Sequence, residues 1–363
     1  MYYTKELDAL NKTNRLRKRD IFQDNIIDFA SNDYLGLSSK KDIFYQAYQL
    51  VEKGVFFSPK SSILVNGYHP IHKQFEDELS SINNFEDGIV VGSGFLANIS
   101  LIEALGRKKD IIFIDEDYHA SGILASKLTD AKVIFFKHND YNDLENKIKQ
   151  NKANRIIIAI EGVYSMLGDI SPKEFNSIAL KYDAILLVDE AHSSGVIGEN
   201  LLGWYDYWNI NIEKNHIKMG TLGKAYGSYG AYILASKHII SYLTNRAKPI
   251  IYSTAPSLFD IALGLISFRY IINNKTNIKN QIIKQHTLVK DILNINTPSL
   301  ILPIEINDNK KVIEIQKDLI KECFLIGAIR QPTVKKAILR IILKLDINIQ
   351  TTTKMLKLLA NVK

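Results

Sequence analysis

The sequence is poor in cysteine, because Cys323 is the only one among 363 residues. One thiol cannot form an internal disulfide, and such sparing use of cysteine fits a reducing compartment. Cys323 stands in a helical pattern of apolar residues with Leu319 and Ile326. We therefore predict a small buried side chain at this position and no role as a nucleophile.

Long hydrophobic runs are also missing. No apolar run approaches the roughly 18 residues that a helix needs to span a bilayer, and residues 1–7 show no apolar core of a signal peptide. The net charge of +7 is spread along the chain, and basic residues cluster only at positions 15–19. We therefore expect a cytoplasmic protein that binds neither membrane nor nucleic acid.

What the sequence does contain is a series of short apolar runs rich in β-branched residues. Helical or turn-rich segments separate the runs, such as residues 70–82, whose apolar positions repeat with the helical period. This alternation is typical of a mostly parallel sheet that is covered by helices on both faces. The runs lie at residues 89–91, 111–114, 133–136, 156–160, 185–188 and 232–235.

Polar residues directly follow four of these runs. Residues 92–98 form a glycine turn that leads into a helix, where free N–H groups suit a phosphate. His119, Ser165 and the pair Asp189 and His192 follow three other runs. Ligands of parallel sheets bind beyond the carboxyl ends of the strands, so these side chains are candidate site residues.

The stretch Met219–Tyr232 contains one lysine, Lys224, among four glycines and two hydroxyl residues. Glycines allow the backbone to approach a ligand closely, and a partly desolvated lysine amine becomes a better nucleophile. Taken alone, the stretch is better explained by a glycine-rich turn with a solvated lysine. The residues at the strand ends reverse this interpretation.

Together these residues suit pyridoxal phosphate, which needs a lysine, an anion at its pyridine nitrogen, a surface for its ring and N–H groups for its phosphate. Lys224 is the lysine, and Asp189 supplies the anion. His192 can reach the phenolic oxygen, and His119 can stack on the ring. The phosphate can be held by Ser93, Gly94, Phe95 and Thr221.

Each residue also has a plainer explanation. Asp189–His192 resembles the Asp-Glu-x-His box of helicases, but the Gly-x-x-x-x-Gly-Lys-[Ser/Thr] loop which that function requires is missing from the sequence. The same two residues could also simply orient each other. As metal ligands they would lack the further ligands that a metal needs, so we predict no metal site. A lone His119 is more often structural. The order of the pieces at successive strand ends favours the cofactor.

Composition changes beyond about residue 270, where the sequence becomes rich in Asn and Lys. We predict an N-terminal segment at 1–40, a large domain at 41–270 and a small C-terminal α+β domain at 271–363. The elements expected in the terminal parts are a helix at 5–20, an extended segment at 26–37, a helix at 273–296, a strand at 300–306, a helix at 310–323 and a strand at 337–343.

In chain order, these motifs resemble the α-oxoamine synthases, a family of fold-type I pyridoxal-phosphate enzymes. The matches cover nearly the whole chain and are Asn32-Asp-Tyr-Leu-Gly-Leu37, Ser93-Gly-Phe-Leu-Ala-Asn98, His119-Ala-Ser121, Glu161-Gly-Val-Tyr-Ser-Met166, Val188-Asp-Glu-Ala-His192, Thr221-Leu-Gly-Lys-Ala-Tyr-Gly227, Ile251-Tyr-Ser-Thr254 and Ala328-Ile-Arg-Gln-Pro-Thr-Val334. The resemblance implies an α/β fold with a mostly parallel seven-stranded sheet between helices in the large domain. It also implies a homodimer.

The resemblance implies a role for each cofactor-binding residue. Lys224 would form the internal aldimine, Asp189 would pair with the pyridine nitrogen, and His119 would lie over the ring. Ser165 and His192 would lie near the phenolic oxygen. The remaining cofactor contacts would come from the phosphate ligands Ser93, Gly94, Phe95 and Thr221 and, across the dimer, from Thr254.

The resemblance also implies a substrate site. Arg330, with Asn32 and Thr333, would bind the carboxylate of the amino acid, since a planar guanidinium pairs with both oxygens. Arg17 stands near the position of an arginine that the family places close to the acyl group. Where the family has a glycine-rich stretch ending in Ser-Arg, this chain has Lys60-Ser-Ser-Ile63, which changes the acyl side of the pocket.

Within the family, the short N-terminus and the segment Lys248–Thr254 most resemble the 8-amino-7-oxononanoate synthases of biotin synthesis. The expected reaction is a decarboxylative condensation of L-alanine with a pimeloyl thioester, either pimeloyl-CoA or pimeloyl-acyl carrier protein. In it, Lys224, His119, Asp189 and His192 would be catalytic. The alternatives are an enzyme of the 2-amino-3-ketobutyrate CoA ligase, 5-aminolevulinate synthase or serine palmitoyltransferase type, or an aminotransferase or lyase on the same fold.

Overall fold

The structure is a computed structural model that describes residues 2–13, 15–17 and 19–360. Positions 1, 14, 18 and 361–363 lie outside the described residues; they belong to the predicted N-terminal segment and C-terminal domain, and Lys18 to the predicted basic cluster. The chain forms two compact units. The larger comprises residues 35–165 and 169–280, and the smaller comprises the chain up to residue 34, residues 166–168 and the chain from residue 281.

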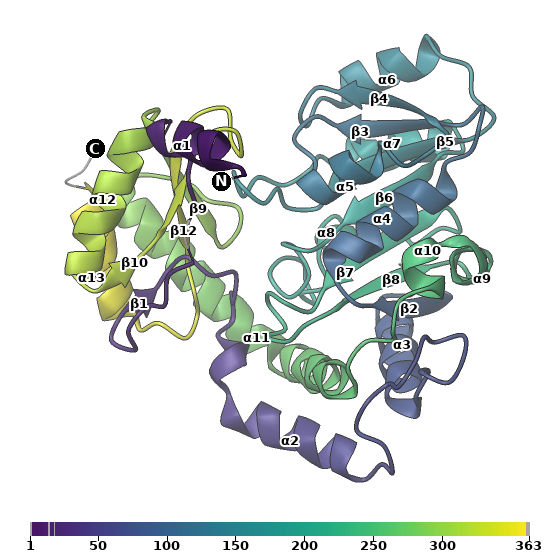
Figure 1. Ribbon diagram of the computed structural model, residues 1–363, viewed down its shortest axis with the longest axis horizontal. Coiled ribbons are helices and arrows are strands. Elements are labelled where there is room, and N and C mark those ends of the chain that lie inside the picture. Colours follow the sequence, from purple (N-terminus) through teal and green to yellow (C-terminus); the bar gives the residue numbers. More distant parts are fainter. Residues whose placement is uncertain (1, 14, 18, 361–363) are drawn as a thin grey trace. The chain divides into compact units, whose positions relative to one another are not determined.

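The larger unit is built on a seven-stranded sheet with the strand order β2-β8-β7-β6-β5-β3-β4 (Figure 1). Only β8 runs antiparallel to its neighbours, so the sheet is mostly parallel, as the resemblance implies. The strands are β2 (Asp87–Val91), β3 (Ile111–Asp115), β4 (Lys132–Phe136), β5 (Ile156–Glu161), β6 (Ile185–Asp189), β7 (His216–Thr221) and β8 (Ala231–Ala235).

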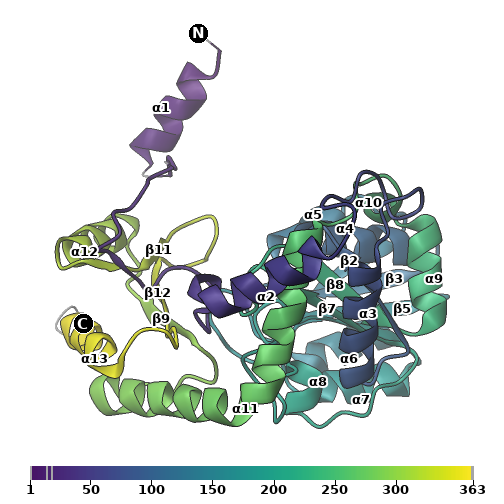
Figure 2. The same ribbon diagram turned by 90° about the horizontal axis from the view of Figure 1, so that it is seen from below.

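Helices cover both faces of this sheet (Figure 2). On one face, apolar residues of α4, α5, α9 and α10 join alternate strand residues in one core cluster. On the other face, α3 and α7 pack on the strands through Phe75 and Phe175, which are fully buried. The helices of this unit are α2 (Lys41–Glu52), α3 (Pro70–Ile82), α4 (Gly94–Leu105), α5 (Ala120–Ala125), α6 (Tyr141–Lys149), α7 (Glu174–Lys181), α8 (Trp204–Tyr207), α9 (Lys237–Arg246) and α10 (Lys248–Ile251), with a 3-10 turn at Leu37–Ser39.

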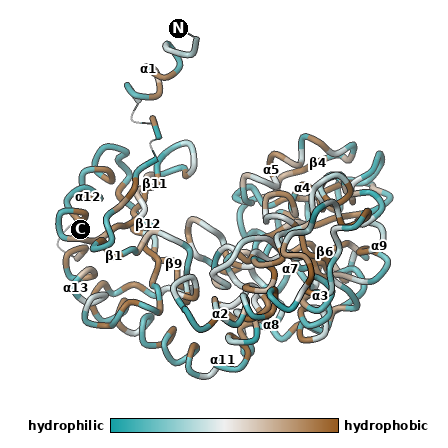
Figure 3. The backbone as a smooth tube through the Cα atoms, turned by 60° about the horizontal axis from the view of Figure 1, so that its bottom comes forward, coloured by the Kyte–Doolittle hydropathy of each residue, from teal (hydrophilic) through white to brown (hydrophobic). Residues whose placement is uncertain are grey.

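Burial on both faces explains why the strands are continuous apolar runs. Every residue of β3 and β8 is buried, and the tube through the sheet is largely brown, the hydrophobic colour, in Figure 3. All six runs identified in the sequence are strands. The strand without such a run is β7, where the buried side chains of His216 and Lys218 interrupt the apolar pattern.

The smaller unit is α+β, as expected for the C-terminal domain. Its antiparallel sheet has the order β11-β12-β9, and a separate pair joins β1 to β10. Its elements are α1 (Thr4–Lys12), β1 (Ile27–Asp28), β9 (Ile301–Glu305), α12 (Asn309–Lys321), β10 (Phe324–Leu325), β11 (Gly327–Ile329), β12 (Ile338–Ile342) and α13 (Ile349–Ala360).

Backbone hydrogen bonds explain why the N-terminal residues group with the C-terminal ones. Phe29 donates its N–H to Leu325 O at 2.8 Å and accepts the N–H of Ile342 at 2.8 Å. The units therefore divide at residues 34 and 280, whereas the sequence placed divisions at 40 and 270. Short strands at the two chain ends carry too little pattern to reveal this pairing.

The interpretation of Cys323 as a buried helical residue is wrong. Helix α12 ends at Lys321, and Cys323 follows it with a φ of 63° and an intermediate exposure. The backbone leaves the helix here in a left-handed conformation, which usually ends a helix. The apolar pattern continues because Phe324 enters β10, not because the helix continues.

One long helix, α11 (Leu258–Leu293), contains 36 residues and begins well before the predicted residue 273. Its second half carries many Asn and Lys residues. Among the described residues, no helix combines the length and the apolar composition that a membrane crossing requires.

Candidate active site

A cavity of about 210 Å³ opens in the larger unit where the parallel strands end. Asp189 and Glu161 are the last residues of β6 and β5, and Thr221 is the last residue of β7. This is the edge where ligands bind in open α/β sheets. The cavity is lined by Gly94, Phe95, Asn98, His119, Ser121, Glu161, Asp189, Ala191, His192, Met219, Thr221 and Lys224.

Lys224 lies half-buried in the loop that joins β7 to β8. The loop is closed by two backbone bonds: Leu222 N–H donates to Gly230 O at 2.9 Å, and Ser228 N–H donates to Leu222 O at 2.9 Å. Gly227 has a φ of +58°, and an added Cβ would lie 2.5 Å from Ser38 N. Glycine is therefore required there, and the turn that presents Lys224 depends on it.

The Lys224 amine lies 2.8 Å from His192 Nε2. His192 is buried and comes from the turn after β6, so the lysine and histidine reach the cavity from neighbouring strand ends. An amine in contact with an imidazole can exchange a proton with it. The sequence placed both residues in the site, and the structure brings them together.

The turn between β2 and α4 meets the end of β7. Ser93 caps α4, and its hydroxyl accepts the N–H of Leu96 at 3.2 Å. A Cβ added to Gly94 would lie 3.8 Å from Thr221 Oγ1, so the two predicted phosphate-binding segments are adjacent. The start of a twelve-residue helix beside a hydroxyl suits a phosphate.

Asp189 is buried and held from two sides. Its Oδ1 accepts the backbone N–H of Ala191 at 3.0 Å, and its Oδ2 accepts from Asn98 Nδ2 at 2.9 Å. A carboxylate fixed in this way can face a protonated ring nitrogen. Sequence reasoning missed Asn98, although it lay within a quoted motif, because its partner is 91 residues away.

His119 lines the cavity next to Ser121. Its Nδ1 lies 2.7 Å from Ser121 Oγ and accepts the backbone N–H of Ser121 at 3.3 Å. The pKa of His119 is lowered, mainly by desolvation. The charge of Asp189 opposes this shift, and that of Lys224 adds to it. A histidine with a lowered pKa suits stacking on an electron-poor ring, because it stays neutral.

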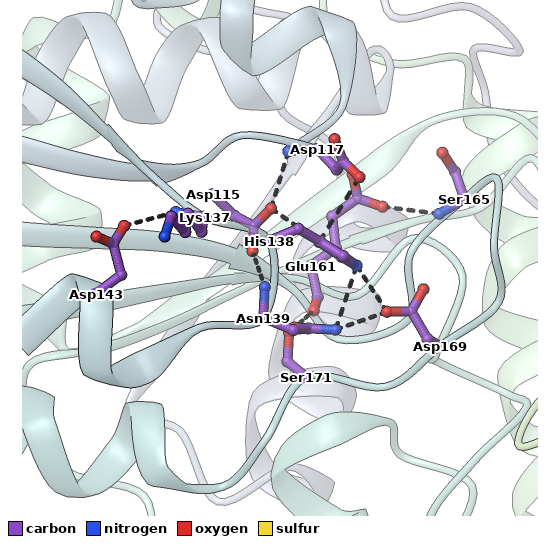
Figure 4. A network of polar contacts seen from close by, with 10 residues as sticks. All are labelled: Asp115, Asp117, Lys137, His138, Asn139, Asp143, Glu161, Ser165, Asp169 and Ser171. Atoms are coloured by element: carbon purple, nitrogen blue, oxygen red, sulfur yellow. Dashed lines mark hydrogen bonds and ion pairs between the residues drawn. The ribbon is translucent and has the colours of Figure 1, made fainter. Parts of the chain in front are cut away.

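Glu161 is a cavity residue that the sequence analysis did not select. Its Oε2 accepts the N–H of Ser165 at 3.1 Å (Figure 4), whereas its Oε1 has no hydrogen-bond partner among the described residues. Burial and, next, the nearby charge of Asp189 raise the pKa of Glu161 well above its usual value. A buried polar atom without a partner at a cavity wall suggests a ligand contact.

The residues present fit pyridoxal phosphate. An amine, a fixed carboxylate and a histidine share one cavity with the capped start of a helix. The unpartnered Glu161 Oε1 shows that the lining has unused hydrogen-bonding capacity for a polar ligand. This donor and acceptor set corresponds to the amine, anion, ring surface and phosphate contacts that the cofactor requires.

Three predicted cofactor contacts, Ser93, Ser165 and Thr254, are not among the residues that line the cavity. Ser165 is buried, and its N–H bonds to Glu161 just behind the cavity wall. Thr254 is exposed, between α10 and α11, next to Ala255, whose N–H donates to Ser61 O at 3.0 Å. The predicted role of Thr254 belongs to a neighbouring subunit and stays a prediction.

The predicted substrate-binding residues lie in the smaller unit. Asn32 Oδ1 accepts from Arg340 Nη2 at 2.9 Å, and Arg17 Nη2 donates to Thr333 Oγ1 at 3.3 Å. Arg330 is half-buried and directly follows β11. Buried Arg340 is a contact of Asn32 that the sequence analysis did not anticipate.

Known proteins resemble this chain over most of its length. A family model described as aminotransferase class I and II matches residues 24–356. An 8-amino-7-oxononanoate synthase of Helicobacter pylori is 44% identical over 99% of this chain and 97% of that protein. That of Thermosipho melanesiensis is 34% identical over 87% of this chain and 82% of that protein.

Solved structures confirm the fold predicted from the sequence. The crystal structure of 8-amino-7-oxononanoate synthase from Francisella tularensis aligns with a TM-score of 0.79 at 29% identity, covering 94% of this chain and 98% of that one. The serine palmitoyltransferase of Sphingomonas wittichii aligns with a TM-score of 0.88 at 23% identity, covering 99% and 98%. The latter likeness concerns the fold alone.

Proposed function

Because this chain belongs to the class I and II aminotransferase family and, within it, to the group of the 8-amino-7-oxononanoate synthases, we propose that it is a pyridoxal-phosphate-dependent acyltransferase. It condenses L-alanine with a pimeloyl thioester to give 8-amino-7-oxononanoate for biotin synthesis. The carboxyl group of alanine leaves as carbon dioxide, the thiol carrier is released, and the acyl group is transferred to the α-carbon.

One observation carries this proposal: the Lys224 amine and the Asp189 carboxylate line the same cavity at the ends of β7 and β6. When bound, pyridoxal phosphate supplies an electron sink for the pair left at the substrate's α-carbon. Asp189, held in place by Asn98 and Ala191, would pair with the ring nitrogen. Ser93, Gly94, Phe95 and Thr221 would hold the phosphate.

The remaining residues move protons and orient the substrate. Lys224 Nζ would accept the proton of the α-carbon, and His192 Nε2, 2.8 Å from that amine, could exchange a proton with it. His119 would lie over the ring. In the smaller unit, Arg330 with Asn32 and Thr333 binds the carboxylate, and Arg17 lies on the acyl side. A guanidinium that fixes this carboxylate would also fix which bond at the α-carbon breaks.

A substrate panel tests the proposal. The purified enzyme is loaded with pyridoxal phosphate and given glycine, alanine or serine, each with acetyl, succinyl, pimeloyl or palmitoyl thioesters. Release of free thiol and carbon dioxide is followed. Alanine with the pimeloyl thioester should give the highest kcat/KM. A higher value with another pair would assign a different synthase, and amino-group transfer without carbon dioxide release would assign an aminotransferase.

The carrier of the pimeloyl group is decided by the same assay. Pimeloyl-CoA and pimeloyl-acyl carrier protein are compared at equal concentration. Arg15, Arg17 and Arg19 are exposed, and a basic surface of this kind steers an acidic carrier protein by charge. A preference for the carrier protein that disappears at high salt would support charge steering, and equal use of both carriers would contradict it.

The proposed enzyme is a homodimer. On the larger unit, exposed apolar side chains gather on α2 and the residues that follow it. The segment that carries exposed Tyr252 joins these residues through the N–H of Ala255, which donates to Ser61 O. Such contiguous exposed apolar side chains mark an interface. The exposed residues are Phe44, Tyr45, Tyr48, Val55, Phe56, Phe57, Val65 and Tyr252.

Sedimentation equilibrium tests the dimer. The wild type should have twice the chain mass of 41.2 kDa. Val55 and Tyr252 are 85% and 80% exposed, so Val55→Asp with Tyr252→Asp should leave the monomer folded but place charges in the interface. Leu180→Asp, an equivalent change at an exposed apolar residue of α7, is the control. A monomeric wild type would contradict the proposal.

A further inference from the structure

One buried amide connects two separate parts of the site. Asn98, on α4, is 1% exposed. Its Nδ2 donates to Asp189 Oδ2 at 2.9 Å and to Ser121 Oγ at 2.9 Å, and its Oδ1 accepts from the hydroxyl of Tyr118 at 2.8 Å. All hydrogens of the amide nitrogen are therefore in use.

The chemistry of these partners determines the orientation of the amide. A carboxylate oxygen only accepts hydrogen bonds, so the atom of Asn98 that faces Asp189 must be the nitrogen. The oxygen then faces Tyr118. Burial raises the pKa of Tyr118 well above its usual value, so this hydroxyl keeps its proton and donates it to Asn98 Oδ1.

The orientation of Asn98 in turn determines that of Ser121. Ser121 Oγ accepts from Asn98, so its single hydrogen is available for its other neighbour, His119 Nδ1, at 2.7 Å. The backbone N–H of Ser121 also points at His119 Nδ1, at 3.3 Å. The nitrogen Nδ1 therefore accepts two hydrogen bonds, and the neutral ring carries its proton on Nε2.

We propose that Asn98 is a positioning residue that, with Ser121 and Tyr118, fixes both the carboxylate of Asp189 and the Nε2–H tautomer of His119. The inference rests on the proposed function, in which Asp189 would pair with the ring nitrogen of the cofactor and His119 would lie over its ring. A single amide thus helps to orient both Asp189, at the ring nitrogen, and His119, over the ring. Preorganised donors and acceptors of this kind need no rearrangement during a reaction.

The test is nitrogen NMR of the full chain with labelled histidine, loaded with pyridoxal phosphate. His119→Gln identifies the signals of His119 by their loss. In the wild type, Nε2 should be protonated and Nδ1 unprotonated. In Ser121→Ala, the fraction with a proton on Nδ1 should rise, because the nearer of two donors is lost. Asn98→Ala should give a smaller rise, since the Ser121 hydroxyl can then accept as well as donate.

Ser100→Ala is the matched control, because Ser100 is a buried serine on the same helix whose hydroxyl donates only to Leu96 O, at 2.8 Å. It should leave the signals of His119 unchanged. A proton on Nδ1 in the wild type, or a tautomer that Ser121→Ala leaves unaltered, would overturn the proposal. This readout needs no substrate, so it remains decisive even if the enzyme uses another amino acid or thioester.

A second measurement separates the effect of Asn98 on Asp189 from the effect of Ser121 on His119. The dissociation constant of pyridoxal phosphate should rise about tenfold in Asn98→Ala, which loses a hydrogen bond to a charged group, and less than about threefold in Ser121→Ala, which does not contact Asp189. Equal weakening in both variants would contradict the assignment of the Asp189 contact to Asn98.

Discussion

At the scale of single residues, burial and neighbouring charge determine how Glu161 behaves. It is 1% exposed, and its pKa is raised by burial and by Asp189 against the opposing effect of Lys224. A carboxyl group with a raised pKa keeps its proton, so one of its oxygens is a donor. The unpartnered Oε1 would then offer a hydrogen bond to a ligand in the cavity.

We therefore expect Glu161→Gln to bind pyridoxal phosphate within about threefold of the wild type, because the amide imitates the protonated acid. Glu161→Ala should bind it at least about tenfold more weakly and should loosen the segment at Ser165, whose N–H it no longer holds. Fluorescence titration of both variants measures this. Weak binding by the Gln variant would mean that Glu161 acts as a carboxylate.

Single residues also show how much of the site could be predicted from the sequence. Lys224 and Asp189 could be selected because strand ends and glycines mark their positions. Asn98 and Glu161 could not, because the neighbour that gives each its role is Asp189, which only the fold brings near; Asn98 and Asp189 are 91 positions apart. An asparagine in a helix has no distinctive pattern until that partner is known.

At the scale of elements, the turn between β7 and β8 depends on one of its glycines, Gly227. Gly227→Ala should destabilise the protein by about 2–4 kcal/mol, because φ is +58° and the new Cβ would lie 2.5 Å from backbone nitrogen of Ser38. Gly223→Ala in the same turn is the control, since its nearest atoms would be 3.6 Å and 3.9 Å away. Urea unfolding measures both; equal stability of the two variants would refute a requirement for glycine at 227.

A second element-scale feature is the ion-pair network at the ends of β3 and β4 (Figure 4). His138 Nδ1 lies 3.0 Å from Asp115, and its Nε2 lies 2.8 Å from Asp169. Burial lowers the pKa of His138, but hydrogen bonds to the two carboxylates outweigh this and raise the pKa to about 10. The charged imidazole thus ties the segment after β5 to the end of β3.

This network predicts a pH dependence. Because the folded pKa of about 10 lies above the unfolded value, the stabilisation by His138 is complete below about pH 6.5 and is lost as the pH rises towards 10. The unfolding free energy of the wild type should fall more steeply over that range than that of His138→Gln. Urea unfolding at several pH values compares them, and parallel curves would show that His138 is not charged in the folded state.

Elements were predictable where one pattern dominated. The β-branched runs identified six strands to within two residues at either end, and the helical period identified α3 with the bounds that the structure has. Strand β7 was hidden by buried Lys218, whose ammonium is bound by Asn83 Oδ1 at 2.8 Å and by Leu202 O. Tertiary partners stabilise that charge, and local sequence does not contain them. The prediction of a buried helical residue at Cys323 failed for the opposite reason, because the apolar periodicity continued past the end of a helix.

At the scale of the whole molecule, the predicted site residues are divided between the two units. The larger unit contains the cofactor residues, and the smaller contains Asn32, Arg330, Thr333 and Arg17. The family resemblance gave these four residues their roles, and their action on the substrate stays a prediction. The proposed reaction depends on the larger unit, because without a cofactor on Lys224 the substrate residues would have no reaction to serve.

Peptide mass mapping after borohydride reduction tests this most directly. Reduction makes a lysine–cofactor bond permanent, so the loaded protein should carry one phosphopyridoxyl group on the peptide that contains Lys224. The same treatment of Lys224→Ala should give no labelled peptide. Label at another lysine, for example the buried Lys218 within β7, or no label in the wild type, would contradict an imine between Lys224 and the cofactor.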